Sequence, residues 1–175
     1  MVTPLSIIFG GLLAAFLLGL LSKLSGALTR ITTLVVIAFG AVVSLSWLVG
    51  LLGGSIPETA TVVTTAGFDP PLSIALRMGV LESGLTLLVT TAFFLGAIYL
   101  LPLFRRRSAA AQVLYLLMMV GASGVIMTRD LFNLFVFLEI LSIATYGLLA
   151  LNDRKRALAA GFKYVIAGGV ASALR

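Results

Sequence analysis

The feature that most constrains this chain is a set of long apolar runs that contain no charged residue. Four such runs are at least 21 residues long: Met1–Ser22, Ile31–Pro57, Ser83–Phe104 and Ser108–Thr128. About 20 apolar residues, rising ~1.5 Å each in a helix, cross the ~30 Å hydrocarbon core of a bilayer. Each run is therefore predicted to form a transmembrane helix.

Two further runs have the length of a membrane span but carry one charge each. Leu131–Asn152 contains Glu139, and Ala157–Leu174 contains Lys163. Barrel strands are excluded because they are ~10 residues long and alternate polar with apolar residues. The sequence thus predicts an all-α, polytopic membrane protein of about six transmembrane helices in a single membrane domain, 1–175. The predicted helices are approximately 4–22, 31–52, 82–104, 109–128, 131–151 and 157–174, with an outer loop at 53–81.

Composition agrees with this class, since 61% of the residues are hydrophobic and only 10% are charged. A soluble domain is closer to half apolar and about a quarter charged. The chain has no cysteine and no histidine, so thiolate and histidine metal sites are excluded. Neither a cofactor nor a metal is expected. No phosphate-binding glycine loop and no nucleophile with a base is present, so the chain is not expected to be an enzyme.

The basic residues gather in alternate loops. The loops after the first, third and fifth predicted helices hold eight of them: Lys23, Arg30, Arg105–Arg107 and Arg154–Arg156. The intervening loops hold two, Arg77 and Arg129. The positive-inside rule therefore predicts a cytoplasmic basic side and both termini outside. The net charge of +6 belongs to these loops, so nucleic acid is not an expected partner.

Glu139 is the residue that most strongly indicates chemistry. It lies near the middle of the run 131–151, where a carboxylate is costly and usually faces a cavity or a partner. Such a group is suited to taking up and releasing protons. The alternative is a glutamate locked to a neighbouring helix by hydrogen bonds.

Lys163 lies about seven residues, or ~10 Å, inside the last predicted helix. Depths counted from the helix ends place it only ~7 Å along the axis from Glu139. The two side chains are therefore candidates for a proton relay or a plain ion pair. A lysine at this depth can also extend its ammonium to the interface.

Three charged residues lie at predicted outer helix ends. Arg129 and Asp130 are adjacent at the start of the run 131–151 and are candidates for admitting ions. Asp130 is also well placed as a helix N-cap, which is the favoured interpretation. Glu82 opens the predicted helix 82–104, where the helix dipole favours a carboxylate, and a structural role is favoured. The stretch Thr59–Thr65 is rich in β-branched residues and suits a short extended piece.

Three stretches carry a resemblance to a known family. They read DLFNLFVFLE at 130–139, GFKYVIAGGVASAL at 161–174 and DPPLSI at 69–74. They resemble the antiporter-like subunits of Mrp-type cation/proton antiporters, membrane-bound hydrogenases and respiratory complex I. The D component of the Mrp type is the most similar. The motif at 130–139 is long and specific, whereas the other two are supportive.

This resemblance implies a function for the two intramembrane charges. Glu139 matches a glutamate essential for proton movement, and Lys163 matches a lysine of the family's central hydrophilic axis. Family members have about fourteen helices and two inverted five-helix repeats. Only the early helices match this sequence, so an incomplete antiporter-like fold is expected. The broken helix whose lysine partners Glu139 in the family is not among them.

The expected function is therefore a proton-translocating antiporter-like subunit, split or shortened, in a multisubunit cation/proton antiporter. Two alternatives stay open: a proton-pumping membrane subunit of a redox-driven complex, and a structural scaffold of such a complex. The implied partners are other membrane subunits, including a chain that supplies the later helices, together with the lipid bilayer and protons. Na⁺ is a candidate cation. The implied location is the cell (inner) membrane of a prokaryote.

Overall fold

The computed structural model describes residues 3–22, 25–57, 61–64, 75–106, 109–151 and 163–170. The labelled elements are six helices, α1 (Leu5–Leu21), α2 (Gly26–Leu52), α3 (Val80–Tyr99), α4 (Leu101–Arg106), α5 (Ala109–Met127) and α6 (Leu131–Ala150), and two short strands, β1 (Val62–Thr64) and β2 (Ala75–Arg77). Residues 163–170 form a further helical segment beyond α6.

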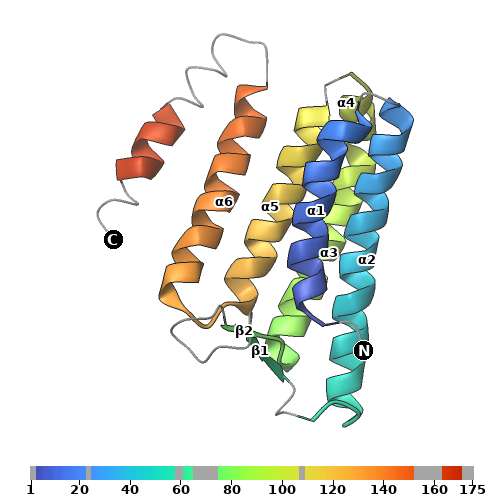
Figure 1. Cartoon of the computed structure of the whole chain (residues 1–175), viewed down its shortest axis with the longest axis vertical. Helices are drawn as coiled ribbons and strands as arrows, with labels where there is room; N and C mark the ends of the chain where they lie inside the picture. The colour runs from blue at the N-terminus through green and yellow to red at the C-terminus, as the bar shows by residue number, and fades with distance from the viewer. Residues whose placement is uncertain are drawn as a thin grey trace.

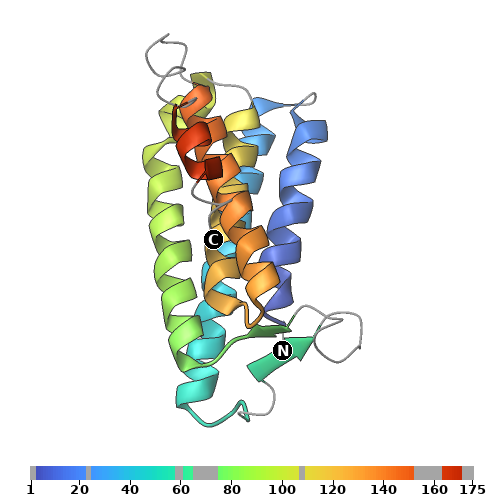
Figure 2. The ribbon, with the colours of Figure 1, turned by 90° about the vertical axis from the view of Figure 1, so that its left-hand side faces the viewer.

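The long helices run up and down in one bundle (Figure 1). The two strands lie at one end of the bundle and α4 lies at the other, as the view turned by 90° also shows (Figure 2). Helix α5 is central, because α1, α2, α3 and α6 all pack against it. The prediction of an all-α polytopic membrane protein is confirmed. Helices α2, α3, α5 and α6 are each long and apolar enough to cross a bilayer, and α1 is apolar but slightly shorter.

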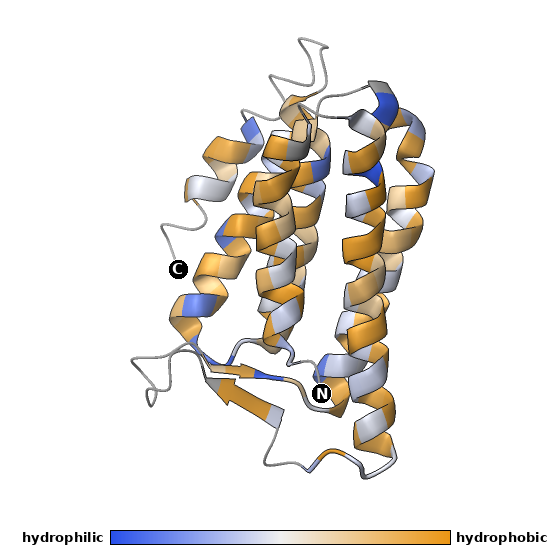
Figure 3. Cartoon of the chain, turned by 45° about the vertical axis from the view of Figure 1, so that its right-hand side comes forward, coloured by the Kyte–Doolittle hydropathy of each residue, from blue (hydrophilic) through white to orange (hydrophobic). Residues whose placement is uncertain are grey.

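The outward faces of the helices are apolar along most of their length (Figure 3). Large apolar side chains such as Phe16, Val49 and Leu88 are more than half exposed. In water, a continuous apolar surface of this kind would drive association, whereas hydrocarbon solvates it. The exposed side chains thus fit a lipid-facing surface.

Two helix boundaries differ from the sequence prediction, each for a local reason. Helix α2 begins at Gly26 rather than near 31, because the Ser25 hydroxyl caps it and accepts from the Ala27 N–H at 3.2 Å. Arg30 therefore lies inside the helix. The predicted helix 82–104 is divided into α3 and α4, with Pro102 just inside the start of α4. Proline suits a first helical turn but cannot continue a helix hydrogen-bond ladder.

The basic residues that the structure describes lie where the charge pattern places them. Arg30, Arg105 and Arg106 lie at the α4 end of the bundle, opposite the strands (Figure 1). The other members of the basic set, Lys23, Arg107 and Arg154–Arg156, lie outside the described residues. So does the family-like stretch 69–74, and of the predicted helix 157–174 only residues 163–170 are described.

Strands β1 and β2 pair antiparallel, with Val62 opposite Arg77 and Thr64 opposite Ala75. The predicted extended piece at Thr59–Thr65 thus contains a strand. Strand β2 also reaches the α5–α6 connection, because the Arg129 N–H donates to the Ala75 carbonyl at 3.0 Å. The paired strands β1 and β2 therefore connect the α2–α3 loop to the start of α6.

Glycines bring α5 and α6 into close contact. A Cβ at Gly121 would lie 2.9 Å from the backbone nitrogen of Leu141, and a Cβ at Gly124 would overlap the ring of Phe137. Small residues at such positions let two helix backbones approach inside a membrane, where dispersion contacts drive helix association. This packing fixes the rotation of α6 about its axis.

We predict that Gly124→Ala lowers the stability of the bundle, because the added methyl group collides with the Phe137 ring. Overpacking of this kind costs about 1–3 kcal/mol. The matched control is Gly10→Ala in α1, where an added Cβ meets nothing within 4 Å. The midpoint of thermal unfolding in detergent, measured by fluorescence-detected size exclusion, should fall for Gly124→Ala and not for Gly10→Ala. Equal midpoints would contradict the packing account.

Candidate functional site

Glu139 lies on the side of α6 that faces away from α5. Phe137 and Ala144 are buried, and the Phe137 ring packs against Gly124 of α5. Each helical residue turns the chain by about 100°, so Glu139, two residues after Phe137, points roughly opposite to that contact. Its side chain is half-buried. The carboxylate is therefore directed away from the helices that pack around α5.

The helical segment 163–170 approaches this same side of α6. Tyr146 follows Glu139 by seven residues, or about two turns, and so shares its face. The Tyr146 ring lies 6.1 Å, centroid to centroid, from the ring of Tyr164. The Tyr146 hydroxyl also contacts Gly168. The face that carries Glu139 is thus a helix-packing surface, as Figure 1 shows from the position of the segment beside α6.

Lys163 lies farther from Glu139 than counting from helix ends suggests. The contacts of Tyr146 with Tyr164 and Gly168 put Lys163 nearly level with Gly147. The axial separation from Glu139 is then about eight to ten residues, or ~12–15 Å, instead of the expected ~7 Å. The Lys163 side chain is exposed. The difference arises because the estimate from the sequence counted depths from the helix ends, and so assumed that both helices cross the whole membrane.

A second charged group lies at the strand end of the bundle. The Arg129 guanidinium donates to the Glu82 carboxylate. The Glu82 side chain is 9% exposed and that of Arg129 is 45% exposed. Glu82 belongs to the first turn of α3, where the helix dipole adds to the attraction. Glu82 therefore has the structural role that the sequence favoured, and its partner Arg129 lies 47 residues away in the sequence.

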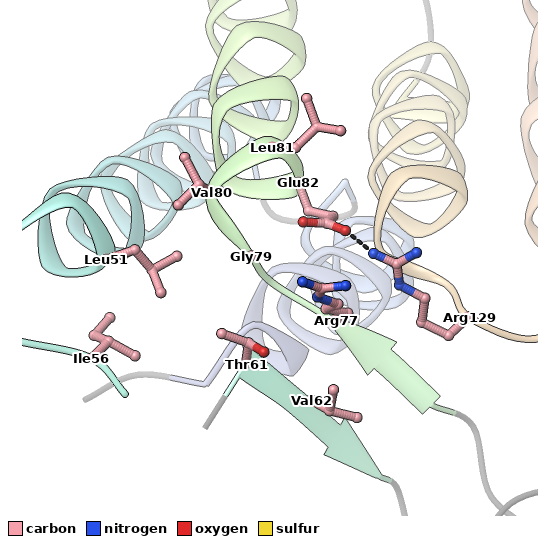
Figure 4. A pocket seen from close by; sticks show the side chains of 10 residues that line it. All are labelled: Leu51, Ile56, Thr61, Val62, Arg77, Gly79, Val80, Leu81, Glu82 and Arg129. Atoms are coloured by element: carbon pink, nitrogen blue, oxygen red, sulfur yellow. Dashed lines mark hydrogen bonds and ion pairs between the residues drawn. The ribbon is translucent and has the colours of Figure 1, made fainter. Parts of the chain in front are cut away.

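Arg77 joins this group. A Cβ on Gly79 would lie 2.6 Å from Oε2 of Glu82 and 3.4 Å from Nε of Arg77, so both side chains flank the same glycine. Figure 4 shows the three charged side chains around one pocket of about 590 Å³. The residues that line it are Leu51, Ile56, Thr61, Val62, Arg77, Gly79, Val80, Leu81, Glu82 and Arg129.

Sequence reasoning missed this pocket because its residues come from four separate segments. The only available signal was the presence of Arg77, Glu82 and Arg129 at the same predicted end of the bundle. Two guanidinium groups and one carboxylate give the pocket a formal charge of +1. It can hold water and attract anions at the membrane surface, with the apolar ends of α2 and α3 as its other wall.

Asp130 is the N-cap of α6. Its carboxylate accepts from the Phe132 N–H at 3.0 Å and from the side-chain amide of Asn133. The capping interpretation is therefore confirmed. Arg129 and Asp130 are adjacent in the chain, but Arg129 turns to Glu82 while Asp130 turns to its own helix.

An intramembrane carboxylate on a helix-packing face, in a bundle of apolar helices, is a feature of polytopic membrane proteins that move protons or ions. Residues 128–174, which contain both Glu139 and Lys163, match the family described as "NADH:quinone oxidoreductase/Mrp antiporter, TM". The resemblance to this family is confirmed.

Individual relatives are named as subunits of the same two kinds of complex as the family description. The chain is 33% identical over 171 residues to the D component of the Na(+)/H(+) antiporter of Bacillus subtilis, covering 93% of this chain and 32% of that protein. It is 38% identical over 111 residues to the N component of the NADH-quinone oxidoreductase of Desulforudis audaxviator, covering 61% of this chain and 22% of that protein. The chain thus spans at most about a third of the length of these relatives.

The fold also matches a solved membrane complex. A chain of the membrane-bound sulfane sulfur reductase, described as an archaeal respiratory membrane complex, superposes with a TM-score of 0.83 at 27% identity. The match covers 97% of this chain and 34% of that chain. A chain of the Mrp complex from Dietzia sp. DQ12-45-1b also superposes, with a TM-score of 0.76 at 20% identity, over 99% of this chain and 33% of that chain. The antiporter-like fold expected from the sequence is therefore present over the part of those chains that this chain matches.

We predict that Arg129→Ala destabilises the bundle because it leaves the buried Glu82 carboxylate without its partner. A buried polar group that loses its partner costs about 1–3 kcal/mol, and more when it is charged. Arg105→Ala, which removes an exposed arginine at the other end, is the matched control.

The double variant Glu82→Gln/Arg129→Gln should recover part of the loss, because no buried charge remains. Thermal unfolding of the wild type, Arg129→Ala, Arg105→Ala and the double variant in detergent measures these differences in stability. An Arg129→Ala protein as stable as Arg105→Ala would contradict the account of the ion pair.

Proposed function

We propose that this chain is a proton-translocating antiporter-like subunit of a multisubunit cation/proton antiporter, in which Glu139 carries the proton. The observation that carries the proposal is the position of Glu139. It is a half-buried carboxylate in a membrane-spanning helix, on the side away from the α5 contact. A carboxylate inside a membrane-spanning helix is costly and usually serves a function, and carrying a proton is the function proposed for it here.

The relatives are about three times as long as this chain, and in the proposed assembly further helices extend the bundle. The proposal places those helices against the Glu139 face of α6, where segment 163–170 already packs. They would enclose the carboxylate and bring to it the lysine that the family resemblance implies. The proposed partners are accordingly other membrane subunits and these later helices, with protons and Na⁺ as the transported ions.

Lys163 has a modulating role in this proposal. At ~12–15 Å along the axis from Glu139, it acts on the carboxylate through the field of its charge rather than through a direct ion pair. Arg129 lines the charged pocket at that end, so its proposed part in admitting ions lies there. Asp130 caps α6, and its proposed part is limited to the charge that it adds next to Arg129. The proposed setting is the cell (inner) membrane of a prokaryote, with the basic α4 end in the cytoplasm and both termini outside.

A second candidate function is supported by two comparisons. One relative is named as a subunit of NADH-quinone oxidoreductase, and the superposed chain comes from a respiratory complex. In that case the same helices would belong to a redox-driven proton pump, and electron transfer elsewhere would drive the proton at Glu139. A pure scaffold is the third possibility, in which Glu139 only holds helices together.

We predict that Glu139→Gln abolishes cation-driven proton movement while the complex still assembles, because glutamine keeps the shape but cannot exchange a proton. The test uses inside-out vesicles that contain the whole complex, with a fluorescent pH probe and addition of Na⁺ or of a quinone reductant. Glu139→Asp should retain part of the activity. Arg105→Gln, an exposed change at the opposite end of the bundle, is the control and should leave proton movement unchanged.

The two driving conditions separate the candidates. A response to Na⁺ alone supports the antiporter, whereas a response only to the reductant supports the redox-driven pump. Unchanged proton movement in Glu139→Gln, or loss of assembly without a change in coupling, would reject the role of Glu139 and leave the scaffold.

A further inference from the structure

The buried hydroxyl groups of the bundle include two sets that differ in their partners. In the first set each hydroxyl donates to the carbonyl four residues earlier in its own chain, the usual way in which a membrane helix satisfies serine and threonine. This set contains Thr33, Ser44, Ser83 and Thr90, at 2.8–2.9 Å. The second set is Thr86 in α3 and Ser123 in α5. Both side chains are fully buried, and neither hydroxyl oxygen has a hydrogen-bond partner among the described residues.

The register of α2 and α5 brings Ser123 opposite Ser44. These two helices run in the same direction (Figure 1). The Thr33 hydroxyl oxygen also lies 3.3 Å from the side-chain oxygen of Gln112, and this contact fixes the alignment of the two helices. Ser44 and Ser123 each follow by eleven residues, which is about three turns. The two serines therefore face each other as Thr33 and Gln112 do, and both are fully buried.

The alignment of α2 with α3 places Thr86 at the same level along the bundle as Ser44 and Ser123. A Cβ on Gly40 would lie 3.3 Å from Cγ2 of Thr90, and these helices run in opposite directions. One turn onward from Gly40 is Ser44, and one turn back from Thr90 is Thr86. Three fully buried hydroxyl groups, each from a different helix, thus lie at one level between α2, α3 and α5.

We propose that Ser44, Thr86 and Ser123 form an internal water-binding site. A buried water makes two to four hydrogen bonds with polar groups that otherwise have no partner. Thr86 and Ser123 each offer one donor and free lone pairs, and the Ser44 oxygen can accept while its proton is donated to the Gly40 carbonyl. Water fits this set better than a cation does, because three neutral hydroxyl groups supply no negative charge to offset a buried cation and fewer oxygen ligands than a metal ion takes.

The site lies one turn inside the charged pocket, since Thr86 follows Glu82 by four residues on the same face of α3. It therefore extends the polar surface of the Glu82–Arg129 end into the bundle. This inference does not depend on the role of Glu139, because it concerns a different set of helices.

The direct test is a cryo-EM map of the whole complex at a resolution that resolves ordered water, in Na⁺ buffer and in Na⁺-free choline buffer. The expected result is a peak within hydrogen-bond distance of both Thr86 Oγ1 and Ser123 Oγ in both buffers. Two results would overturn the proposal. One is a map without the peak, in which the hydroxyls turn back to the carbonyls of Glu82 and Met119. The other is a peak that disappears without Na⁺, which would identify a cation.

Variants give an independent readout. Ser123→Ala should lose the peak and lower the unfolding midpoint of the complex, because the water loses a partner. Thr86→Ser keeps a hydroxyl at the site and should keep the peak. A midpoint that rises in Ser123→Ala would mean that the serine hydroxyl is simply unsatisfied in a dry site, and would also overturn the proposal.

Discussion

The close contact between α5 and α6 determines where Glu139, the residue proposed to carry the proton, lies. Gly121 and Gly124 allow α6 to place Leu141 and Phe137 directly on the α5 backbone. In lipid there is no general hydrophobic force between helices, so such fitted contacts set helix orientation. With α6 held in this rotation, Glu139 is directed to the side away from α5, toward the surface that segment 163–170 approaches. If the α5–α6 contact were looser, α6 could rotate about its axis, and the Glu139 carboxylate would no longer be held on this side of the helix.

The polar groups of the bundle are arranged around this apolar frame. The ion pair of Glu82 and Arg129, together with strand β2, ties the start of α3 to the start of α6. The hydroxyl groups of Ser44, Thr86 and Ser123 lie one helical turn deeper in the bundle than this ion pair, between helices that are otherwise packed by apolar side chains. Since hydrocarbon cannot satisfy a polar group, each of these sites must find its partners within the protein or its bound water. The structure thus separates the polar end of the bundle that carries the strands from the carboxylate at the middle of α6.

Much of the fold could be predicted from the sequence, because span length and hydropathy are local properties. The charge-free runs became helices, Asp130 became the predicted cap, and Glu139 lies in a membrane-spanning helix as expected. What the sequence did not predict depends on how distant segments align. The partner of Glu82, the matching levels of Ser44, Thr86 and Ser123, and the wider separation of Lys163 from Glu139 all follow from inter-helix register. Register is set by side-chain packing, such as the glycine contacts of α5, and no single segment encodes it.

The central claim is that the Glu139 carboxyl group gains and loses a proton during the work of the assembled complex. Infrared difference spectroscopy of the complex, recorded while a cation gradient or a reductant is applied, measures this directly. The expected result is that the carbonyl stretch of a protonated carboxyl group appears and disappears with the driving force, and that substitution of Glu139 by Gln removes that band. A spectrum in which the band is absent, or is unchanged by the substitution, would contradict the claim.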